Sequence, residues 1–389
     1  MGFLKPSIGA MSSLSMEEVQ PQVDKRPARN PVSLLLIGPS MHILGGQAVQ
    51  VHRLLGILED VSDIDVTFLP IDPRPPKFLL WVLSIRGLRT IVTFAQYIVR
   101  LAWRIPRHEV IHIFSAGLTS YALWTMPVLL LGRLWRKKII LNYHDGQGDQ
   151  HLTEWRTAKP SIGLADRVIT PSGFLVDVFR KHGIEARAIV NIIDTSRFIY
   201  RKRRKLRPIF MTNRILEPLY NVECILRAFL IIQKRYPDAT LTIAHNGPSK
   251  ASLEKMAEDL KLKNTRFIGR VPHEQVTELY DAADIYLTSP NIDNMPVSLL
   301  ERFAAGLPIV ATRVGGIPYV ATDRESALLV EKNDHEALAA RSIELLENED
   351  LVEHITNGGL EAVKRYHPAP VREQWAALYR ELAEESRAS

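Results

Sequence analysis

The sequence predicts an α/β protein of two domains, each built around an open parallel sheet. A chain of 389 residues is longer than one ordinary domain and fits two domains of roughly 150–200 residues each. Short apolar runs, typical of buried strands, alternate with helical stretches in both halves of the chain. This alternation indicates parallel strands that are joined by crossover helices. The basic segment 201–205 interrupts the alternation, and we interpret it as the linker between the domains.

The first half of the chain contains six strand-like runs. A glycine-containing loop follows the first run and leads into a helix that ends near residue 59. A long, mostly apolar helix is predicted over about 78–104. The strands are expected near residues 32–37, 64–71, 110–114, 138–143, 167–170 and 188–191.

The second half repeats this arrangement, and two further helices follow it near 351–365 and 370–385. We therefore place the first domain over 31–200 and the second over 206–369, with residues 1–30 as a mobile leader and the C-terminal helix 370–389 packing back on the first domain. The strands of the second half are expected near 208–212, 240–244, 265–268, 284–288, 308–311 and 327–330, and its helices near 221–235, 250–261, 273–282, 297–305 and 335–347.

Composition excludes several classes of protein. Apolar residues make up 46% and charged residues 24% of the chain, as in a globular protein. The single cysteine, Cys224, excludes a disulfide framework and a cysteine-rich zinc site, and it lies in an apolar helical run as a core residue would. A reducing, cytoplasmic setting is expected. The first thirty residues lack the apolar region of a signal peptide.

Positive charge is concentrated in the first domain. Between Pro73 and Tyr143 there are eleven Lys or Arg residues and one acidic residue, Glu109. This stretch is a solvated basic face, a surface for an anionic membrane or a surface for nucleic acid, although no nucleic-acid partner is expected. The helix 78–104 is either a core helix with a solvated stripe or an interfacial helix that contacts anionic lipid, because its polar residues form one stripe on an apolar surface that includes Trp81 and Trp103. The stripe consists of Arg86, Arg89, Thr93, Gln96, Arg100 and Arg104.

The strongest signal for chemistry is the segment 289–301. A strand ends there, a polar loop follows, and Pro296 stands where a helix would begin. The backbone N–H groups of Val297 and Ser298 would then be free to bind phosphate. Asp293 before the helix and Glu301 within it could hold hydroxyl groups at two ends of one ligand. Ligands of open α/β sheets bind outside the carboxyl ends of the strands, which is where this loop is expected.

These residues resemble the donor-site signature of the family-4 retaining glycosyltransferases. The resemblance rests on the two acids with seven residues between them and on the stretches 303–312 and 314–318 that follow; segments 267–269 and 280–285 resemble the preceding strands. It implies a GT-B fold, in which two Rossmann-like domains face each other across a cleft. It also implies that Glu301 binds a ribose and that Asp293 lies at the sugar ring with a catalytic role. The donor would further contact Asn294, Met295, Pro296, Val297 and Ser298.

The same family holds the diphosphate with an Arg–Lys pair early in the second domain. Arg214 matches the arginine, whereas segment 216–221 runs through the position of the lysine with one extra residue. The first acid of the family signature is usually Glu rather than Asp, and Tyr319 stands where an acid usually follows the Gly-Gly-x-Pro turn. One Arg and helix N–H groups can still neutralise a diphosphate.

Two features of the first domain also resemble this family. Gly45 and Gly46 lie in the loop after the first strand, where the family brings backbone close to the sugar and phosphate. His144 follows the strand 138–143 and matches a histidine that faces the cleft, so we predict that it is catalytic. His144, Asp145, Asp149 and His151 are close enough in sequence to suggest a metal site. The family handles diphosphate without a metal, and neither a metal nor another cofactor is expected.

The sequence therefore predicts a transferase that moves a sugar from a nucleotide-sugar donor to a lipid-linked or saccharide acceptor with retention of configuration. Polysaccharide or glycolipid synthesis at the inner face of the membrane is the setting that we expect. Two alternatives stay open. One is a nucleotide-sugar epimerase or hydrolase of the same fold, and the other is an inactive transferase-like binding protein, which the missing lysine would suit.

Overall fold

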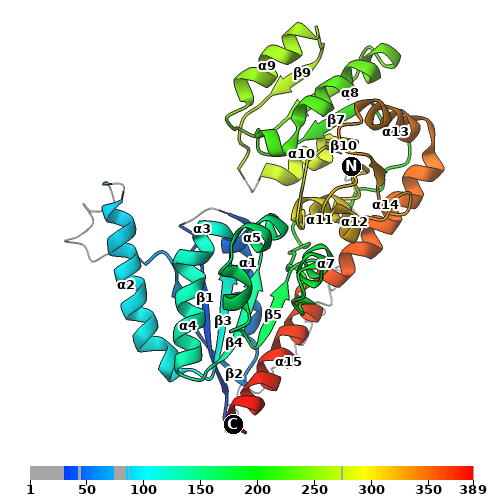
Figure 1. Ribbon diagram of the computed structural model, residues 1–389. Coiled ribbons are helices and arrows are strands. Elements are labelled where there is room, and N and C mark those ends of the chain that lie inside the picture. Colours follow the sequence, from blue (N-terminus) through cyan, green and yellow to red (C-terminus); the bar gives the residue numbers. More distant parts are fainter. Residues whose placement is uncertain (1–29, 43–44, 74–84, 86, 273–274, 389) are drawn as a thin grey trace, which may run out of the picture.

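The computed structural model describes residues 30–42, 45–73, 85, 87–272 and 275–388. Within them, two separate six-stranded parallel sheets are present, one in each half of the chain. Figure 1 shows the sheets in two domains, one above the other, with the C-terminal helix running along one side of both. The leader predicted over 1–30 lies, except for residue 30, outside the described residues.

The first sheet has the strand order β2-β1-β3-β4-β5-β6, and all of its pairs are parallel. Its strands are β1 (Val32–Gly38), β2 (Ile64–Pro70), β3 (Val110–Ser115), β4 (Lys138–Tyr143), β5 (Arg167–Thr170) and β6 (Arg187–Ala188). The helices of this domain are α1 (Gly46–Leu58), α2 (Leu88–Arg104), α3 (Leu118–Ser120), α4 (Met126–Leu134), α5 (Gly148–Glu154), α6 (Ala158–Ile162) and α7 (Gly173–Lys181).

The second sheet has the order β12-β11-β10-β7-β8-β9 and is also parallel throughout. Its strands are β7 (Ile209–Thr212), β8 (Thr240–Ile243), β9 (Thr265–Phe267), β10 (Ile285–Thr288), β11 (Ile309–Thr312) and β12 (Leu328–Val330). Its helices are α8 (Val222–Arg235), α9 (Lys250–Asp259), α10 (Val276–Ala282), α11 (Val297–Ala304), α12 (Ile317–Val320), α13 (His335–Glu347) and α14 (Glu349–Val363).

Both faces of each sheet are covered, which is why the central strands are continuous apolar runs. Alternate residues of β1 enter different cores: Leu35 and Ile37 pack on one face of the sheet, and Leu34 and Leu36 pack on the other. The second sheet likewise separates two cores. Cys224 belongs to one of them and is buried there, as the sequence predicted.

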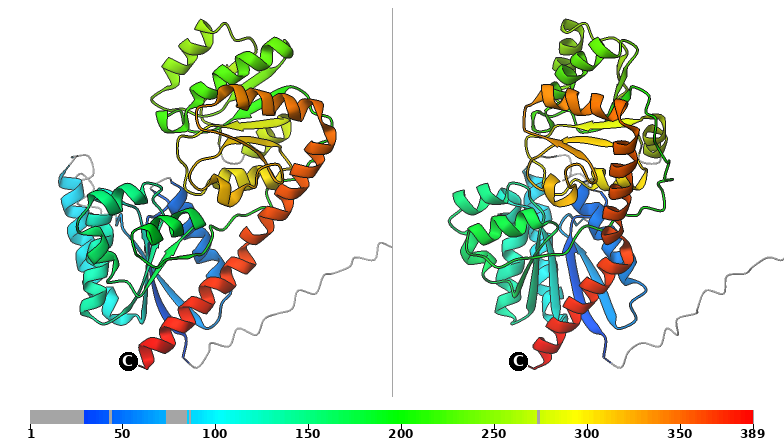
Figure 2. Two further views of the ribbon diagram at one scale, coloured as in Figure 1. Left: turned by 45° about the vertical axis from the view of Figure 1, so that its right-hand side comes forward. Right: turned by 90° about the vertical axis from the view of Figure 1, so that its right-hand side faces the viewer.

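The last helix, α15 (Pro368–Arg387), returns to the first domain, as the views in Figure 2 show. Its apolar face, with Trp375 and Tyr379, completes the core that contains Leu34 and Leu36. Ion pairs fix its charged side, among them Arg380 to Asp63 at 2.6 Å. The chain therefore crosses between the domains twice, once before β7 and once into α15.

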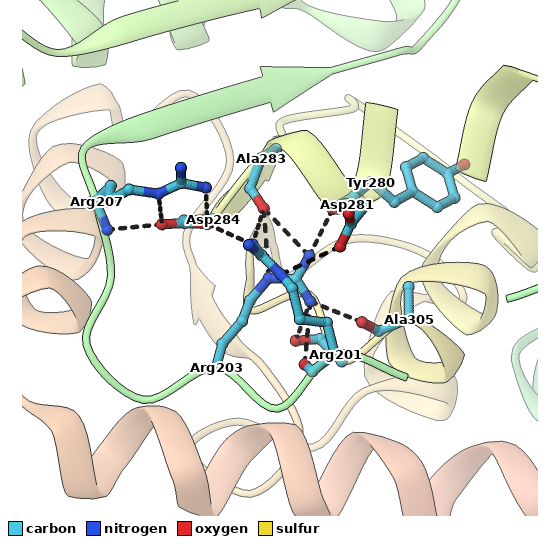
Figure 3. Close-up of polar contacts among 9 residues, drawn as sticks. Arg201, Arg203, Arg207, Tyr280, Asp281, Ala283, Asp284 and Ala305 are labelled. Atoms are coloured by element: carbon cyan, nitrogen blue, oxygen red, sulfur yellow. Dashed lines mark hydrogen bonds and ion pairs between the residues drawn. The ribbon is translucent and has the colours of Figure 1, made fainter. Parts of the chain in front are cut away.

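The basic segment 201–205 lies between the two sheets in sequence but is not a free linker. Arg203 is only 4% exposed, and its guanidinium donates to the backbone carbonyls of Tyr280, Ala283, Ala305 and Gly306 (Figure 3). These carbonyls belong to the C-terminal ends of α10 and α11, where helices leave such groups without partners. The segment between the two sheets is therefore anchored on the second domain by a buried arginine.

The prediction for the long helix also needs correction. Residues 78–84 and 86 lie outside the described residues, and α2 begins at Leu88. The polar stripe predicted for this helix is not fully exposed to solvent, because Thr93, Gln96 and Arg104 are only partly exposed. The outermost face carries Ile91, Val99 and Trp103, which are 66%, 69% and 52% exposed. No helix in the described part of the chain has the length and apolarity that crossing a bilayer requires.

Candidate functional site

The candidate site is built from loops that leave the carboxyl ends of the strands. Loop 289–296 follows β10, Arg214 follows β7 after one residue, and His144 follows β4 directly. The first two belong to the second domain and the third to the first domain. Asn294 joins them, because its Nδ2 donates to the carbonyl oxygen of His144 at 3.1 Å. The predicted residues of both domains therefore meet at the interdomain face.

Arg214 and Asp293 form the centre of the site. The guanidinium of Arg214 lies 2.6 Å from a carboxylate oxygen of Asp293 and donates to the Ser298 hydroxyl at 3.0 Å. The ring of Tyr220 packs against the same guanidinium, 4.2 Å from its centroid. Burial by itself lowers the pKa of Arg214, but the negative charge of Asp293 outweighs this effect and the pKa is raised. Arg214 is thus charged and held rigidly at the start of α11.

Glu301 lies at the edge of a neighbouring cavity of ≈ 280 Å³. Its carboxylate accepts a hydrogen bond from the Tyr280 hydroxyl at 2.8 Å, which fixes its orientation. Asn213, which directly follows β7, donates from its Nδ2 to the same hydroxyl at 3.3 Å. The cavity is lined by Asn213, Ala244, His245, Arg270, Val271, Pro272, Val276, Tyr280 and Glu301.

The start of α11 differs in detail from the sequence prediction. Pro296 is not helical, because its ψ angle is 89°, and the helix begins at Val297. The tight turn at Pro296 directs the Val297 N–H back to the carbonyl of Met295 at 2.9 Å, so this amide is not free. The Ser298 N–H has no hydrogen-bond partner among the described residues. One of the two amides predicted to bind phosphate is therefore available.

Loop 293–296 is wedged between two glycines and the first domain. A side chain at Gly316 would place a Cβ 1.4 Å from the Asn294 carbonyl, and one at Gly315 would lie 2.1 Å from that of Asp293. The Gly316 N–H donates to the Asp293 carbonyl at 2.7 Å. From the other side, the Ser172 hydroxyl donates to Asn294 at 2.7 Å. Met295 is buried in the second-domain core, so it anchors the loop.

His144 lies on the first-domain side of the site, directly after β4. Its backbone N–H donates to the Ser115 carbonyl, and its ring lies 5.1 Å from that of Phe114. Its Nε2 is buried and has no hydrogen-bond partner among the residues that the structure describes. Burial lowers the pKa of His144 to about 3. The imidazole is therefore neutral at physiological pH, so it can donate or accept a hydrogen bond but carries no charge.

Gly45 and Gly46 stand at the N-terminus of α1 on the first domain. A Cβ added at either glycine would meet no atom of the described residues within 4 Å, so these residues leave space beside this backbone. Gln47, the next residue, donates to the Ser115 carbonyl at 3.0 Å and ties the loop to the strand end beside His144. Residues 43–44 of the same loop lie outside the described residues.

The possible metal ligands near β4 have other partners. Asp149 accepts from His182 and Lys181, His151 pairs with the Tyr143 hydroxyl at 3.0 Å, and Asp145 accepts from the Gly117 N–H. In the part of the chain that the structure describes, no group of three or more His, Cys, Asp or Glu side chains is arranged to hold a metal.

Several residues of the site were not predicted from the sequence. Tyr220 belongs to the segment that replaces the family lysine, and Tyr280 lies twenty-one residues before the carboxylate that it holds. Arg302 directly follows Glu301 and is completely buried. A charged residue on the apolar side of α11 was the available signal for Arg302, whereas nothing local distinguishes Tyr280.

Two family models match the chain, and together they run from residue 44 to residue 361. The model described as Glycosyltransferase Family 4 matches residues 44–197. The model described as Glycosyl transferases group 1 matches residues 193–361. The boundary between the matches falls between β6 and β7, and therefore between the two sheets.

Curated relatives resemble part of the chain. A D-inositol 3-phosphate glycosyltransferase of Corynebacterium urealyticum is 30% identical over 175 residues, which are 43% of this chain and 41% of that protein. A GDP-mannose-dependent α-(1-6)-phosphatidylinositol monomannoside mannosyltransferase of Mycolicibacterium smegmatis is 28% identical over 247 residues, which are 57% of this chain and 65% of that protein. The chain thus spans less than two thirds of the length of these relatives.

Solved structures match over nearly the whole chain. The Anabaena protein HepE in complex with UDP has a TM-score of 0.69 and 15% identity, and the match covers 90% of this chain and all of HepE. Sucrose-phosphate synthase from Thermosynechococcus elongatus has a TM-score of 0.68 and 18% identity, covering 91% of this chain and 99% of that protein. These likenesses, with the two facing parallel sheets, confirm the GT-B fold.

Proposed function

The chain belongs to the family-4 glycosyltransferases, and from this premise we propose that it transfers a sugar from a nucleotide-sugar donor to an acceptor with retention of anomeric configuration. The observation that carries the proposal is the cluster of Arg214, Asp293 and Ser298 at the start of α11, beside the cavity edged by Glu301. It joins a cation and a free amide to a carboxylate-lined cavity, which is the combination that a nucleoside diphosphate requires.

The donor would lie along this cluster in three parts. The cavity of ≈ 280 Å³ would take the nucleoside, with the ribose hydroxyls on the carboxylate of Glu301. The diphosphate would meet the Ser298 N–H and the guanidinium of Arg214, which has N–H donors beyond those engaged with Asp293 and Ser298. Asp293 would then face the sugar. The open space beside Gly45 and Gly46 would allow the backbone of the first domain to approach the sugar and phosphate from the opposite side.

His144 would act as a hydrogen-bonding group rather than as an acid or base. Its lowered pKa keeps the ring neutral, so proton exchange with a substrate at physiological pH is unfavourable. A neutral imidazole next to the bridging residue Asn294 could orient a sugar hydroxyl or the acceptor. The leaving diphosphate would be stabilised chiefly by Arg214 and the Ser298 amide.

For the acceptor, we propose a lipid-linked or membrane-proximal saccharide, reached by a cytoplasmic enzyme that binds the inner face of the membrane. The outward side of the first domain supports this proposal. Ile91, Val99 and Trp103 of α2 are exposed there, and Leu134 of the neighbouring helix α4 is 72% exposed. Arg104 and Arg107 lie over the Trp103 ring at 4.7 and 4.3 Å. Tryptophan with flanking arginines suits the boundary between lipid headgroups and acyl chains.

The test is a screen of UDP- and GDP-sugars by thermal shift, followed by transfer assays with the sugars that raise the unfolding midpoint. Retention is checked by determining the anomeric configuration of the product by NMR. Because Arg214 and the Ser298 amide can neutralise the diphosphate, transfer should survive a chelator. Loss of activity with chelator and recovery with a divalent ion would contradict metal independence.

The same assay separates the alternatives. Conversion of the nucleotide-sugar into its epimer or into free sugar, with no acceptor consumed, would replace the transferase by an epimerase or hydrolase. Binding of a nucleotide-sugar without turnover on any lipid-linked or saccharide acceptor would indicate a binding protein. A chain that binds no nucleotide at all would refute the proposal.

A further inference from the structure

Arg302 is a fully buried cation next to the donor site, and neither the sequence motifs nor the proposed reaction assigns it a role. It follows Glu301 in α11, and its side chain is completely shielded from solvent. A buried arginine is expensive, because a charge taken out of water costs several kcal/mol unless close partners replace the water. An apolar side chain at this position of α11 would avoid that cost.

The partners of Arg302 compensate its charge only in part. Its terminal nitrogens donate to the carbonyl of Ser298 and to Oδ1 of Asn213. Its Nε is buried, and no described residue forms a hydrogen bond with it. The rings of Tyr280 and Tyr286 lie on its faces, with centroids 4.4 and 3.9 Å from the guanidinium carbon. These groups are dipoles and π-systems that favour a cation but carry no full negative charge.

The nearest carboxylate is that of Glu301, at 3.8 Å, whereas Arg214 and Asp293 approach to 2.6 Å. The carboxylate of Glu301 is moreover directed by the Tyr280 hydroxyl at 2.8 Å. Arg214 is therefore in direct contact with its carboxylate, whereas Arg302 forms a longer ion pair with Glu301. The two arginines converge on one residue, since Arg214 binds the hydroxyl of Ser298 and Arg302 binds its carbonyl.

The charges of these four side chains contribute to what the site accepts, together with Arg270 in the lining of the cavity and Arg53, which interacts electrostatically with Glu301. Two carboxylates, Asp293 and Glu301, are balanced by two guanidiniums, Arg214 and Arg302, so the set is neutral. Without Arg302 the set would carry one net negative charge in a partly buried place and would repel an anionic ligand. Segment 216–221 supplies a tyrosine, Tyr220, but no cation to this cluster.

We propose that Arg302 is the buried positive charge that makes the donor site able to bind a nucleoside diphosphate. This inference rests on the proposed function. It adds Arg302 to the donor site as a residue that acts through its electrostatic field and does not contact the ligand. The inference predicts different behaviour for two parts of the donor. Binding of the diphosphate depends on Arg302, whereas binding of the uncharged nucleoside does not.

The experiment measures the affinity of UDP, GDP, uridine and guanosine for the native chain and for Arg302→Met and Arg302→Lys. We expect Arg302→Met to lower the affinity for whichever diphosphate the native chain binds by at least about tenfold. The reason is that a unit charge is removed from a low-dielectric environment. The corresponding nucleoside should change by less than about twofold. Arg302→Lys should recover most of the diphosphate affinity. Arg341→Met, which removes a cation from the surface of α13 in the same domain, is the matched control and should change neither ligand.

Each outcome decides a different question. If the native chain binds neither diphosphate, the proposed function fails. If it binds one and Arg302→Met binds it equally well, this inference fails while the proposed function stands. Equal losses of diphosphate and nucleoside, with no recovery in Arg302→Lys, would make Arg302 a structural residue. If Arg302→Met does not fold, the comparison of Arg302→Gln with Arg302→Lys measures the same charge effect.

Discussion

The two domains have the same architecture but bury different charged groups. Among the residues that the structure describes, the first domain buries His108, His112 and His151. The second buries Arg203, Arg302 and one carboxylate, Asp284, which is paired with Arg201 and Arg207. Burial lowers the pKa of His112 and of His151, so both rings are neutral in the folded state. It lowers the pKa of Arg203 to about 10, which leaves the guanidinium charged at pH 7.

This difference corresponds to the two parts of the proposed reaction. A histidine can avoid the cost of burial by losing its proton, whereas an arginine remains charged and must be held by partners. The interior of the first domain is thus neutral near His144, where a sugar and an acceptor would lie. The second domain keeps buried positive charge beneath the site of an anionic donor. Two similar sheets therefore differ in the charge of a few interior side chains, as the proposed division between donor and acceptor would require.

The largest effect is expected at Arg203. In Arg203→Met the carbonyls at the ends of α10 and α11 lose their buried partner, which should destabilise the second domain by about 3–5 kcal/mol. All six tryptophans lie in the first domain or on α15, so tryptophan fluorescence reports the first domain, whereas far-UV circular dichroism reports both. We expect an earlier transition by circular dichroism and a smaller change by fluorescence.

The neighbouring Arg204→Met is the control for this measurement, because Arg204 is exposed and makes surface ion pairs of 3.5 Å or longer with Glu349 and Asp350. It should change stability little. Equal destabilisation by the two variants would show that Arg203 does not anchor the helix ends.

The next largest effect concerns Arg214. Arg214→Ala should weaken UDP or GDP binding by about 1.5–3 kcal/mol, the value of a charge-assisted hydrogen bond, and should change nucleoside binding much less. Because this variant leaves Asp293 without its partner, the double variant Arg214→Ala with Asp293→Asn controls for an unpaired carboxylate. Calorimetric titration measures both affinities. Equal losses for diphosphate and nucleoside would assign Arg214 a structural role.

The buried histidines predict acid sensitivity of the first domain. The folded-state pKa values of His112, His144 and His151 are lower than the unfolded value of about 6.5. The stabilisation is therefore complete above that pH and is lost as the pH falls toward the folded value. For His144, with a folded pKa of about 3, the loss between pH 6.5 and 5 is on the order of 1 kcal/mol. Urea unfolding followed by tryptophan fluorescence measures it.

In His144→Asn this part of the pH dependence should disappear, since asparagine does not titrate. His335→Asn, which removes a histidine from the start of α13, should leave it unchanged. A native chain that is equally stable at both pH values would contradict the neutral interior of the first domain.

The sequence was a good guide wherever local pattern determines structure. The apolar runs located all twelve strands to within a few residues, except that the run predicted at 188–191 is shortened to the two-residue strand β6. Spacing could not give the contacts that tertiary packing creates. The amide of Val297, the burial of Arg203 and the Tyr280–Glu301 contact depend on how a loop turns or on which elements meet, and these are non-local properties. The roles predicted for Asp293, His144 and the donor-binding residues stay predictions.

The smallest expected effect concerns the outer surface of the first domain, where α2 and α4 expose large apolar residues. Apolar residues of α2 face solvent beside exposed arginines such as Arg100, so we expect the chain to float with anionic vesicles and to be released as salt rises, because the attraction is screened within about 8–10 Å. Arg100→Gln should weaken vesicle binding by roughly 1 kcal/mol, about fivefold. Arg235→Gln, which removes an exposed cation from α8 of the second domain, should have no effect. Binding to neutral and anionic vesicles alike would mean that the apolar residues alone determine attachment. If the chain binds neither kind of vesicle, α2 is an ordinary surface helix, and the acceptor is a soluble molecule rather than a membrane-bound one.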